Sequence, residues 1–532
     1  MVGVNRTAAR VLTIAGVLAG LLASAEVSRS APGDRDRGFG RRGALLTDVG
    51  RRSDDRCFEL ALQRDGKVVC VGVTVPRGSQ SEDVLVTRYL SDGRRDPAFG
   101  SGGILRFDSG LARDDVATTG LVQRDGKIVV AGVSDVAVGQ DVLVARFRPD
   151  GSRDATFGSG GFVTSDIGGE AGDFDYAFAV ALQRDGKIVV AGQTATGTNS
   201  DVAVARYTAQ GALDSTFGAR GKVRVDFGAV DAAYAVLMLP GGKILVGASA
   251  PRGNEEFGLL RLLPNGRRDR TFGRDGLAGI DVGNVDADLR ALVRLPSGKL
   301  VAVGTGFDEA RNYSVLAGTR ADGRLDRRFG RQGRLILKAP GPPGESGAFA
   351  AAALSSGKFV IAGGTGGRIF VSRHLPDGRH DPSFGGTGLV ATRIASGVGW
   401  ASAVAVQPDD AVVAAGSWSR RGNHDLAVLR LRGRGTRGTT ITSLSVRATR
   451  AGRVVRWRTS SEAQAARFEV YREGQDGLVP VYPRPAGVGG PRRGGAYSVR
   501  DGYRLRAGLQ LVYWLIEVKN DGRRITYGPI VG

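Results

Sequence analysis

A ten-residue segment, QRDGKIVVAG, occurs at residues 123–132 and again without change at 183–192, with a near copy, QRDGKVVCVG, at 63–72. A second motif, Asp-x-x-Phe-Gly-x-x-Gly, occurs seven times at intervals of 55 to 60 residues, with its phenylalanines at Phe39, Phe99, Phe157, Phe217, Phe272, Phe329 and Phe384. A period of this length and regularity is typical of solenoids and propellers.

Each period contains four short apolar segments bounded by Gly, Asp and Pro. In the fourth copy these are residues 222–227, 233–239, 243–249 and 257–263. Segments of this length and pattern predict β-strands, and the Asp-Gly between the second and third segments of the first copies predicts a two-residue hairpin turn. Four antiparallel strands in seven copies predict an all-β fold, a seven-bladed β-propeller of four-stranded blades.

The recurring side chains are interpreted as structural, because repeated positions serve packing between repeats. The main examples are Lys67, Lys127 and Lys187 after the hairpin turn and Phe99, Phe157 and Phe217 in the second motif. The motif aspartates are expected to cap a turn or to pair with an arginine of the fourth strand. The first motif precedes any complete copy, so the N-terminal piece is expected to complete the ring beside the last strand.

These motifs resemble the bacterial delta-60 repeat propeller family. The resemblance rests on the Asp-x-x-Phe-Gly-x-x-Gly motif, on QRDGKIVVAG and on DVLVARFRPDGSRDATFG at residues 141–158, and it covers residues 34–432. Later copies replace Asp-Gly-Lys with Gly-Gly-Lys or Ser-Gly-Lys, and the seventh has Asp-Asp-Ala. The resemblance implies an exported propeller without an assigned activity.

The two ends of the chain differ from the repeats. Two arginines, an apolar run and a small-residue triplet predict a signal peptide at residues 1–25, with no membrane span left after cleavage. Residues 433–440 are interpreted as a linker, and residues 441–532 resemble a fibronectin type III-like β-sandwich, with Trp457 and Trp514 in its core.

Cysteine and charge add two expectations. With Asp65-Gly66 as a two-residue turn, Cys57 and Cys70 would lie about 13 Å apart along the hairpin, so both thiols are predicted to be unpaired. The net charge of +21 is carried largely by arginine. For an exported protein this charge favours a glycan, an anionic envelope polymer or a surface protein as partner over nucleic acid, and a solvated basic surface is the alternative.

Binding specificity is expected on the face formed by the variable loops. Aspartates end the first strand of five copies, at Asp48, Asp108, Asp166, Asp226 and Asp281, and a second set follows at Asp55, Asp115, Asp175, Asp231 and Asp286. Such carboxylates suit Ca²⁺, although turn capping is the alternative. Trp400 and Trp418 lie at the same end of the last copy, and an indole ring can stack on a sugar or fill a core.

No nucleophile elbow, phosphate loop or zinc-protease motif is present, and the three histidines are scattered. The sequence therefore predicts an exported, monomeric, non-enzymatic protein of the surface or the exterior, acting in binding or as a scaffold without a cofactor. Two alternatives stay open. One is an extracellular polysaccharide-active enzyme that uses carboxylates of the variable face, and the other is an adhesin stabilised by Ca²⁺.

Overall fold

The computed structural model describes residues 31–433, except 51, 111–113, 170–171, 198, 229, 253–254, 284, 309–310, 340–345 and 421, and then residues 441–449, 451–459, 465–474, 477–481, 486–487, 496–503, 511–519 and 524–531. These residues fall into two compact units, which we call the repeat unit, up to residue 433, and the C-terminal unit, from residue 441. The predicted signal peptide and most of the predicted linker lie outside the described residues.

The repeat unit consists of antiparallel groups of four strands, five of which are separate sheets. Four of them are β2 (Asp54–Leu62), β3 (Val68–Val75), β4 (Asp83–Tyr89) and β5 (Ile104–Phe107); β14 (Ala232–Met238), β15 (Ile244–Arg252), β16 (Glu255–Leu262) and β17 (Leu277–Ile280); β18 (Asp286–Arg294), β19 (Leu300–Asp308), β20 (Arg311–Thr319) and β21 (Arg334–Ala339); and β22 (Gly347–Ala353), β23 (Phe359–Thr365), β24 (Arg368–His374) and β25 (Leu389–Thr392).

Eight further strands form one continuous sheet that divides into two groups of four. The groups are β6 (Asp115–Val122), β7 (Ile128–Asp135), β8 (Gln140–Phe147) and β9 (Phe162–Ser165), and β10 (Phe174–Leu182), β11 (Ile188–Thr196), β12 (Asn199–Tyr207) and β13 (Lys222–Val225). The groups are joined through the single parallel pair Phe174 and Gln140. Each group therefore has the strand order of the separate sheets.

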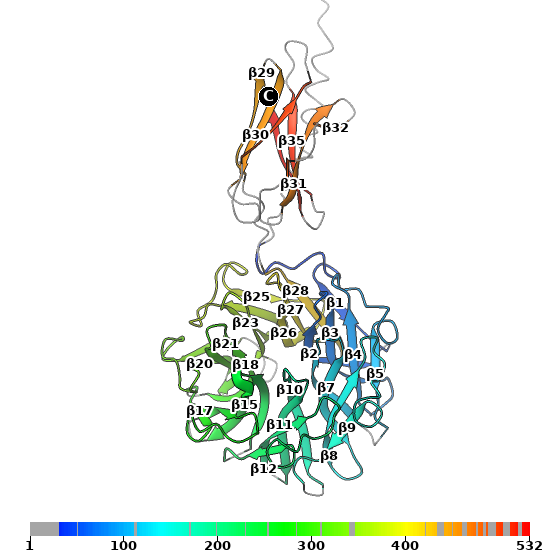
Figure 1. The fold of residues 1–532 in the computed structure, drawn as a ribbon, viewed down its shortest axis with the longest axis vertical. Helices are drawn as coiled ribbons and strands as arrows, with labels where there is room; N and C mark the ends of the chain where they lie inside the picture. The colour runs from blue at the N-terminus through cyan, green and yellow to red at the C-terminus, as the bar shows by residue number, and fades with distance from the viewer. Residues whose placement is uncertain are drawn as a thin grey trace, which may run out of the picture. The chain divides into compact units, whose positions relative to one another are not determined.

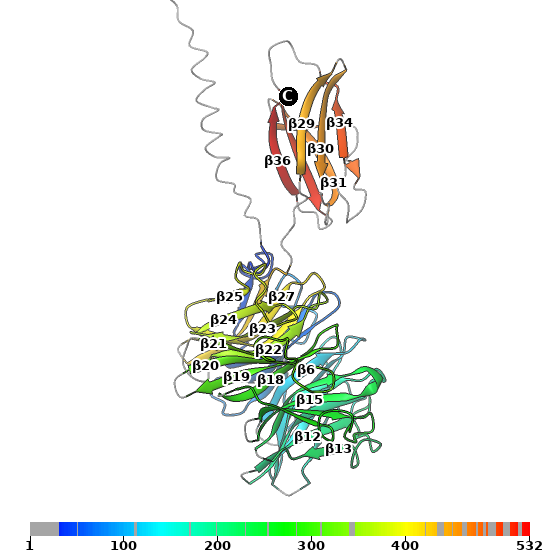
Figure 2. The ribbon, with the colours of Figure 1, turned by 90° about the vertical axis from the view of Figure 1, so that its left-hand side faces the viewer.

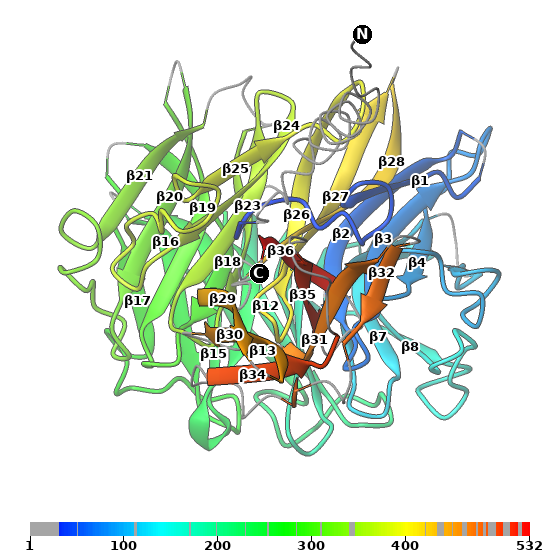
Figure 3. The ribbon, with the colours of Figure 1, turned by 90° about the horizontal axis from the view of Figure 1, so that it is seen from above.

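The last sheet combines the two ends of the repeat unit. Its strands are β26 (Val398–Val406), β27 (Val412–Arg420), β28 (Asn423–Leu431) and β1 (Ala44–Thr47). Ala44 pairs with Leu429, so β1 lies beside β28 at the place expected from the sequence (Figure 3). The sheets surround a common centre, with β2, β10, β18 and β26 toward the middle and β5, β9 and β17 toward the rim (Figure 1).

The hairpins differ from the prediction in their turn. Gly66 N donates to Gln63 O at 3.0 Å and Gln63 N donates to Lys67 O at 2.9 Å, and Gly66 has a φ of 85°. This is a three-residue loop in which a type I turn is followed by a left-handed glycine, whereas the expected type I′ turn needs positive φ at both central residues.

The expectation of two unpaired thiols is wrong. Cys57 and Cys70 form a disulfide with their Cα atoms 5.9 Å apart. The longer loop places Cys70 opposite Leu60, and a bulge at Phe58 takes one residue out of the pairing, so Cys57 lies opposite Gly72. The two cysteines are therefore diagonal neighbours across β2 and β3, within the range that a disulfide spans.

The repeated motif residues gather where neighbouring sheets meet. Arg146 Nε donates to Asp154 at 2.8 Å, and Lys127 Nζ lies 3.4 Å from the same carboxylate. The Arg146 guanidinium lies over the Phe157 ring at 4.7 Å and donates to the carbonyl of Ala209, which follows β12 in the next group of four strands. Equivalent clusters contain Lys67, Arg88, Asp96 and Phe99, and Lys187, Arg206, Asp214 and Phe217.

The C-terminal unit has two sheets. One contains β29 (Ile441–Thr449), β30 (Gly452–Thr459) and β34 (Ala496–Asp501), as Figure 2 shows, and the other contains β31 (Ala465–Gly474), β32 (Gly477–Pro480), β33 (Ala486–Gly487), β35 (Val512–Lys519) and β36 (Arg524–Val531). Trp457 is buried in a cluster that draws residues from both sheets. The side chain of Trp514 lies outside the described residues. No helix in the described parts of the chain is long and apolar enough to cross a membrane.

Candidate functional site

The innermost strand of every four-stranded group carries a β-bulge at the same point. The strands are β2, β6, β10, β14, β18, β22 and β26, and the residue left out of the pairing is Phe58, Thr118, Phe178, Tyr234, Arg290, Phe349 and Ser402 in turn. All seven residues line one cavity of about 400 Å³. Because a bulge re-aims a side chain, one repeated irregularity builds the wall of this cavity, which we call the central channel.

A glycine opposite six of the seven bulges explains the last letter of QRDGKIVVAG. A Cβ atom at Gly192 would lie 1.8 Å from the carbonyl oxygen of Tyr176, and one at Gly132 would lie 1.9 Å from that of Val116. Glycine occupies this position in six of the seven strands, and Ala248 occupies it in β15. The repeat thus carries one signal for the channel wall, the glycine that ends each of these segments.

The bulged side chains differ from sheet to sheet, and several of them stack. The Phe178 ring lies 5.0 Å from that of Tyr234, and Phe178 also stacks on Tyr176 at 5.8 Å. The Arg290 guanidinium lies 4.9 Å from the centre of the Tyr234 ring. Flat rings beside a cation can hold a sugar face or another planar group while hydrogen-bonding its polar edge.

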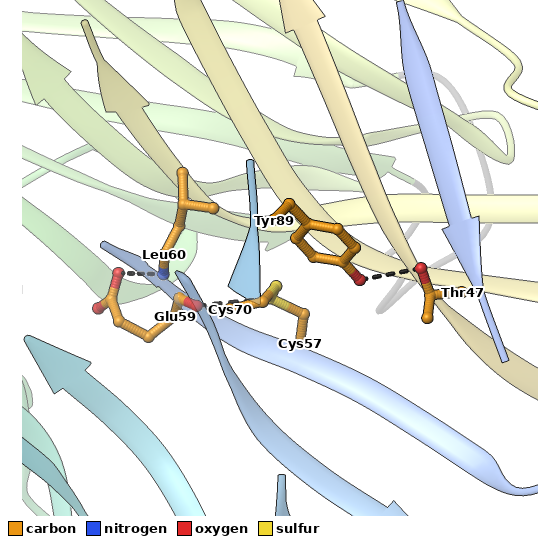
Figure 4. The surroundings of a disulfide bond; sticks show 6 residues. All are labelled: Thr47, Cys57, Glu59, Leu60, Cys70 and Tyr89. Atoms are coloured by element: carbon orange, nitrogen blue, oxygen red, sulfur yellow. Dashed lines mark hydrogen bonds between the residues drawn. A yellow bond between two sulfur atoms is a disulfide. The ribbon is translucent and has the colours of Figure 1, made fainter. Parts of the chain in front are cut away.

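Glu59 is the acidic residue of the channel wall. It follows the bulged Phe58 and accepts a hydrogen bond from Leu60 N at 2.8 Å (Figure 4). Burial raises the pKa of Glu59 to about 7. Figure 4 also shows the Cys57–Cys70 disulfide close to Glu59. This bond joins β2 to β3 just before the bulge, so the cross-link fixes the part of β2 that presents Phe58 and Glu59 to the channel.

A second cavity, of about 330 Å³, adjoins the channel and shares Arg290 and Phe349 with it. Asp286 and Asp288 also line this cavity, and Asp288 is 3.0 Å from Arg290. Phe307, at the edge of the cavity, is 39% exposed. The aromatic wall therefore continues from the channel into a side cavity that also carries carboxylates.

A family model described as "Domain of unknown function (DUF5122) beta-propeller" matches residues 63–99, 123–157, 183–217 and 239–272. The matches fall on the same part of four successive copies, from the turn before Lys67 and its equivalents to the motif phenylalanine. The chain is a β-propeller repeat protein. Its four-stranded groups are the blades, and the motif clusters that join them lie between blades.

A comparison with curated proteins gives no match. Among solved structures, the polysaccharide lyase Uly1 is similar to 71% of this chain over 90% of its own length, with a TM-score of 0.42 and 12% identity. An ulvan lyase of family PL25 covers 73% of this chain and 96% of its own, with a TM-score of 0.38 and 12% identity. The prolyl oligopeptidase B of Galerina marginata covers 85% and 60%, with a TM-score of 0.38 and 9% identity. Similarity at this level transfers no activity to the propeller.

The two tryptophans proposed as ligand residues differ in position. Trp418 is fully buried in the core of its blade, and its Nε1 donates to Ser396 O at 3.1 Å. A buried indole cannot offer its face to a ligand. Trp400 is half-buried and packs edge-on against His424 at 5.6 Å, and neither tryptophan lines the channel.

The five aspartates proposed as metal ligands all cap their own turns. Asp48, Asp108, Asp166, Asp226 and Asp281 each accept a hydrogen bond from a backbone N–H two to four residues further along the chain. Two of the five also belong to groups of three carboxylates, Asp166 with Asp173 and Asp175, and Asp226 with Asp201 and Asp231. Asp281 instead pairs with Arg334 at 2.8 Å.

Proposed function

We propose that the protein is an exported binding protein that holds an extended glycan in the central channel of a seven-bladed propeller. Residues 1–25 would be its signal peptide, residues 34–432 the propeller and residues 433–440 a linker. Residues 441–532 would form a fibronectin type III-like sandwich that spaces or attaches the propeller, a proposal supported by the cluster around Trp457 shared between the two sheets. We expect a monomer at the cell surface or outside the cell.

The observation that carries the proposal is the stacked run of Phe178, Tyr234 and Arg290 in the channel wall. Large aromatic side chains usually fill cores, yet these rings line a cavity that adjoins a second one with carboxylates. A sugar chain suits such a path, because its ring faces stack on aromatic groups while its hydroxyls bond to charged edges. The arginine would also favour a glycan with an acidic substituent.

The test is binding of the mature chain to an array of neutral and acidic glycans and anionic envelope polymers. The variant Phe178→Ala/Tyr234→Ala should bind at least about tenfold more weakly, since each stacked pair contributes about 0.5–1.5 kcal/mol beyond burial. Trp400→Ala removes an aromatic ring outside the channel and should bind like the wild type. The reverse pattern would place the ligand on the last blade, and binding to no polymer would favour a protein partner at the variable loops.

A polysaccharide-active enzyme is the second candidate, and Glu59 is the observation that favours it. A carboxylate with a pKa of about 7 can act as a general base or acid near neutral pH. Incubation of each bound glycan with the wild type and with Glu59→Gln separates the two functions. Product formation that disappears in Glu59→Gln while binding persists would establish the enzyme; unchanged glycan in both samples supports binding alone.

A further inference from the structure

The variable face carries a carboxylate cluster between the blade β6–β9 and the blade β10–β13. Asp166 follows β9, Asp173 precedes β10 and Asp175 lies within it. One oxygen from each lies within 4.8 Å of the others. Two oxygens bound to one Ca²⁺ at 2.3–2.6 Å can be no more than about 5 Å apart, so the three side chains meet the spacing that one ion requires.

A buried hydroxyl outside the carboxylate group points into the same place. Thr194 lies opposite Asp175 in the sheet and is 2% exposed, and its Oγ1 makes no hydrogen bond within the described residues. A Cβ atom on Gly168 would lie 2.4 Å from this Oγ1 and 1.9 Å from Asp173 Oδ2, so both oxygens converge beside Gly168. Asp175 Oδ1 is also buried without a hydrogen bond there. Buried oxygens of this kind are unfavourable unless a cation or a donor satisfies them.

The equivalent junction at β2 supplies an internal comparison. Asp55 corresponds to Asp175, and both of its oxygens are satisfied by protein donors: Ser53 Oγ at 2.9 Å and Val49 N at 2.8 Å on one, and Thr74 Oγ1 at 2.7 Å on the other. At the junction with β10 the position of Ser53 is taken by Asp173. An ionised carboxylate accepts and cannot donate, so the substitution removes a donor and adds a negative charge.

We propose that Asp166, Asp173, Asp175 and the hydroxyl of Thr194 bind one divalent cation of the Ca²⁺ class between these two blades. Four protein oxygens with three negative charges leave room for water to complete the six to eight ligands that Ca²⁺ takes. Mg²⁺ demands a tighter octahedron and releases water reluctantly, so it should bind more weakly. The site is independent of the glycan proposal.

Calorimetric titration of the full mature chain, stripped of metal, with CaCl₂ and separately with MgCl₂ tests the site. We expect one Ca²⁺ per chain and weaker Mg²⁺ binding. Asp173→Ser recreates the Ser53 arrangement, so it should fold while binding Ca²⁺ at least about tenfold more weakly, as expected when one of three carboxylate ligands is lost. Asp226→Ser, in the other carboxylate group, should leave this binding intact.

Three results would overturn the assignment. The first is that the wild-type protein binds no Ca²⁺ at concentrations up to about 10 mM, which is well above the dissociation constants of weak extracellular sites. Water or a proton would then satisfy the buried oxygens. Unchanged binding in Asp173→Ser would place the ion elsewhere. Binding lost in Asp226→Ser but kept in Asp173→Ser would move it to the group of Asp201, Asp226 and Asp231. Because the titration contains no glycan, its failure says nothing against channel binding.

Discussion

Replacing Glu59 with glutamine should change how the stability of the propeller depends on pH. Burial raises the pKa of this carboxyl from 4.5 to about 7. The folded protein therefore keeps the proton between these values while the unfolded chain loses it, so this contribution to stability is fully present below pH 4.5 and is lost as pH rises through 7. At 1.36 kcal/mol per pH unit the loss is about 3 kcal/mol, and water in the channel reduces it toward about 2 kcal/mol.

Scanning calorimetry at pH 4.5 and pH 8 measures this effect. With an unfolding entropy of about 2.1 cal/mol/K per residue and roughly 400 residues in the propeller, 2–3 kcal/mol corresponds to about 3 °C in Tm. The difference in Tm between Glu59→Gln and the wild type should increase by that amount from pH 4.5 to pH 8. The wild type loses stability over this range, whereas neutral glutamine does not titrate. Asp409→Asn, in an exposed turn, should show no such change. A Glu59→Gln difference that is the same at both pH values would refute the burial of this charge.

Three further variants test contacts within and between the blades. The double variant Cys57→Ala/Cys70→Ala removes a disulfide that closes a loop with a sequence separation of 13. It should lower the free energy of unfolding, measured by urea titration, by about 3 kcal/mol. Equal stability of the wild-type protein with and without reductant would contradict the cross-link. Asp154→Asn leaves the buried Arg146 without its carboxylate and should cost about 3–5 kcal/mol, whereas Lys127→Met should cost less than about 1 kcal/mol. Similar losses for both would mean that the lysine, not the arginine, dominates the cluster.

The acid dependence of the same cluster follows from Asp154. Desolvation raises the pKa of this carboxyl, but hydrogen bonds from Thr156 and the charges of Arg146 and Lys127 outweigh it and lower the pKa to about 2. The stability it contributes is present above pH 3.8 and is lost as pH falls toward 2. In urea titrations at pH 5 and pH 2.5, Asp154→Asn should therefore differ less from wild type at the lower pH; an equal difference at both would contradict the ion pair.

The strands of the repeated copies could be predicted from the sequence, but the turn and the bulge that set their register could not. Alternating apolar segments and the spacing of the motif phenylalanines predicted four-stranded sheets and the pairing of β1 with β28. The register of β2 and β3 depended on a turn type that Asp-Gly does not decide and on a bulge whose one signal in the sequence is the glycine opposite it. A two-residue turn therefore put Cys57 and Cys70 far apart, and the disulfide was missed.

The candidate site was missed for a related reason. Trp400 and Trp418 were predicted as ligand residues because they are the largest side chains at the variable-loop end of the last blade. Trp418, however, fills the blade core. The channel residues occupy a fixed position whose identity changes from Phe58 to Thr118 to Arg290, so they form no motif themselves, and the glycine opposite is the signal that marks their position. Constant geometry with changing chemistry is what a ring of repeats needs to build one asymmetric site.

The glycine opposite the β10 bulge makes this geometry testable. In Gly192→Ala the new Cβ would lie 1.8 Å from the Tyr176 carbonyl oxygen, a backbone contact that no side-chain rotation relieves. We expect a loss of about 1–3 kcal/mol, as for overpacked cores, together with weaker glycan binding because the bulge that presents Phe178 must shift. Gly247→Ala is the matched control, since its Cβ would meet only Leu289 methyl groups, at 3.1 Å or more, and Ala235. If Gly192→Ala kept both its Tm and its ligand, the glycine would not be what holds the bulge, and the channel wall would have to be fixed by the blade junctions instead.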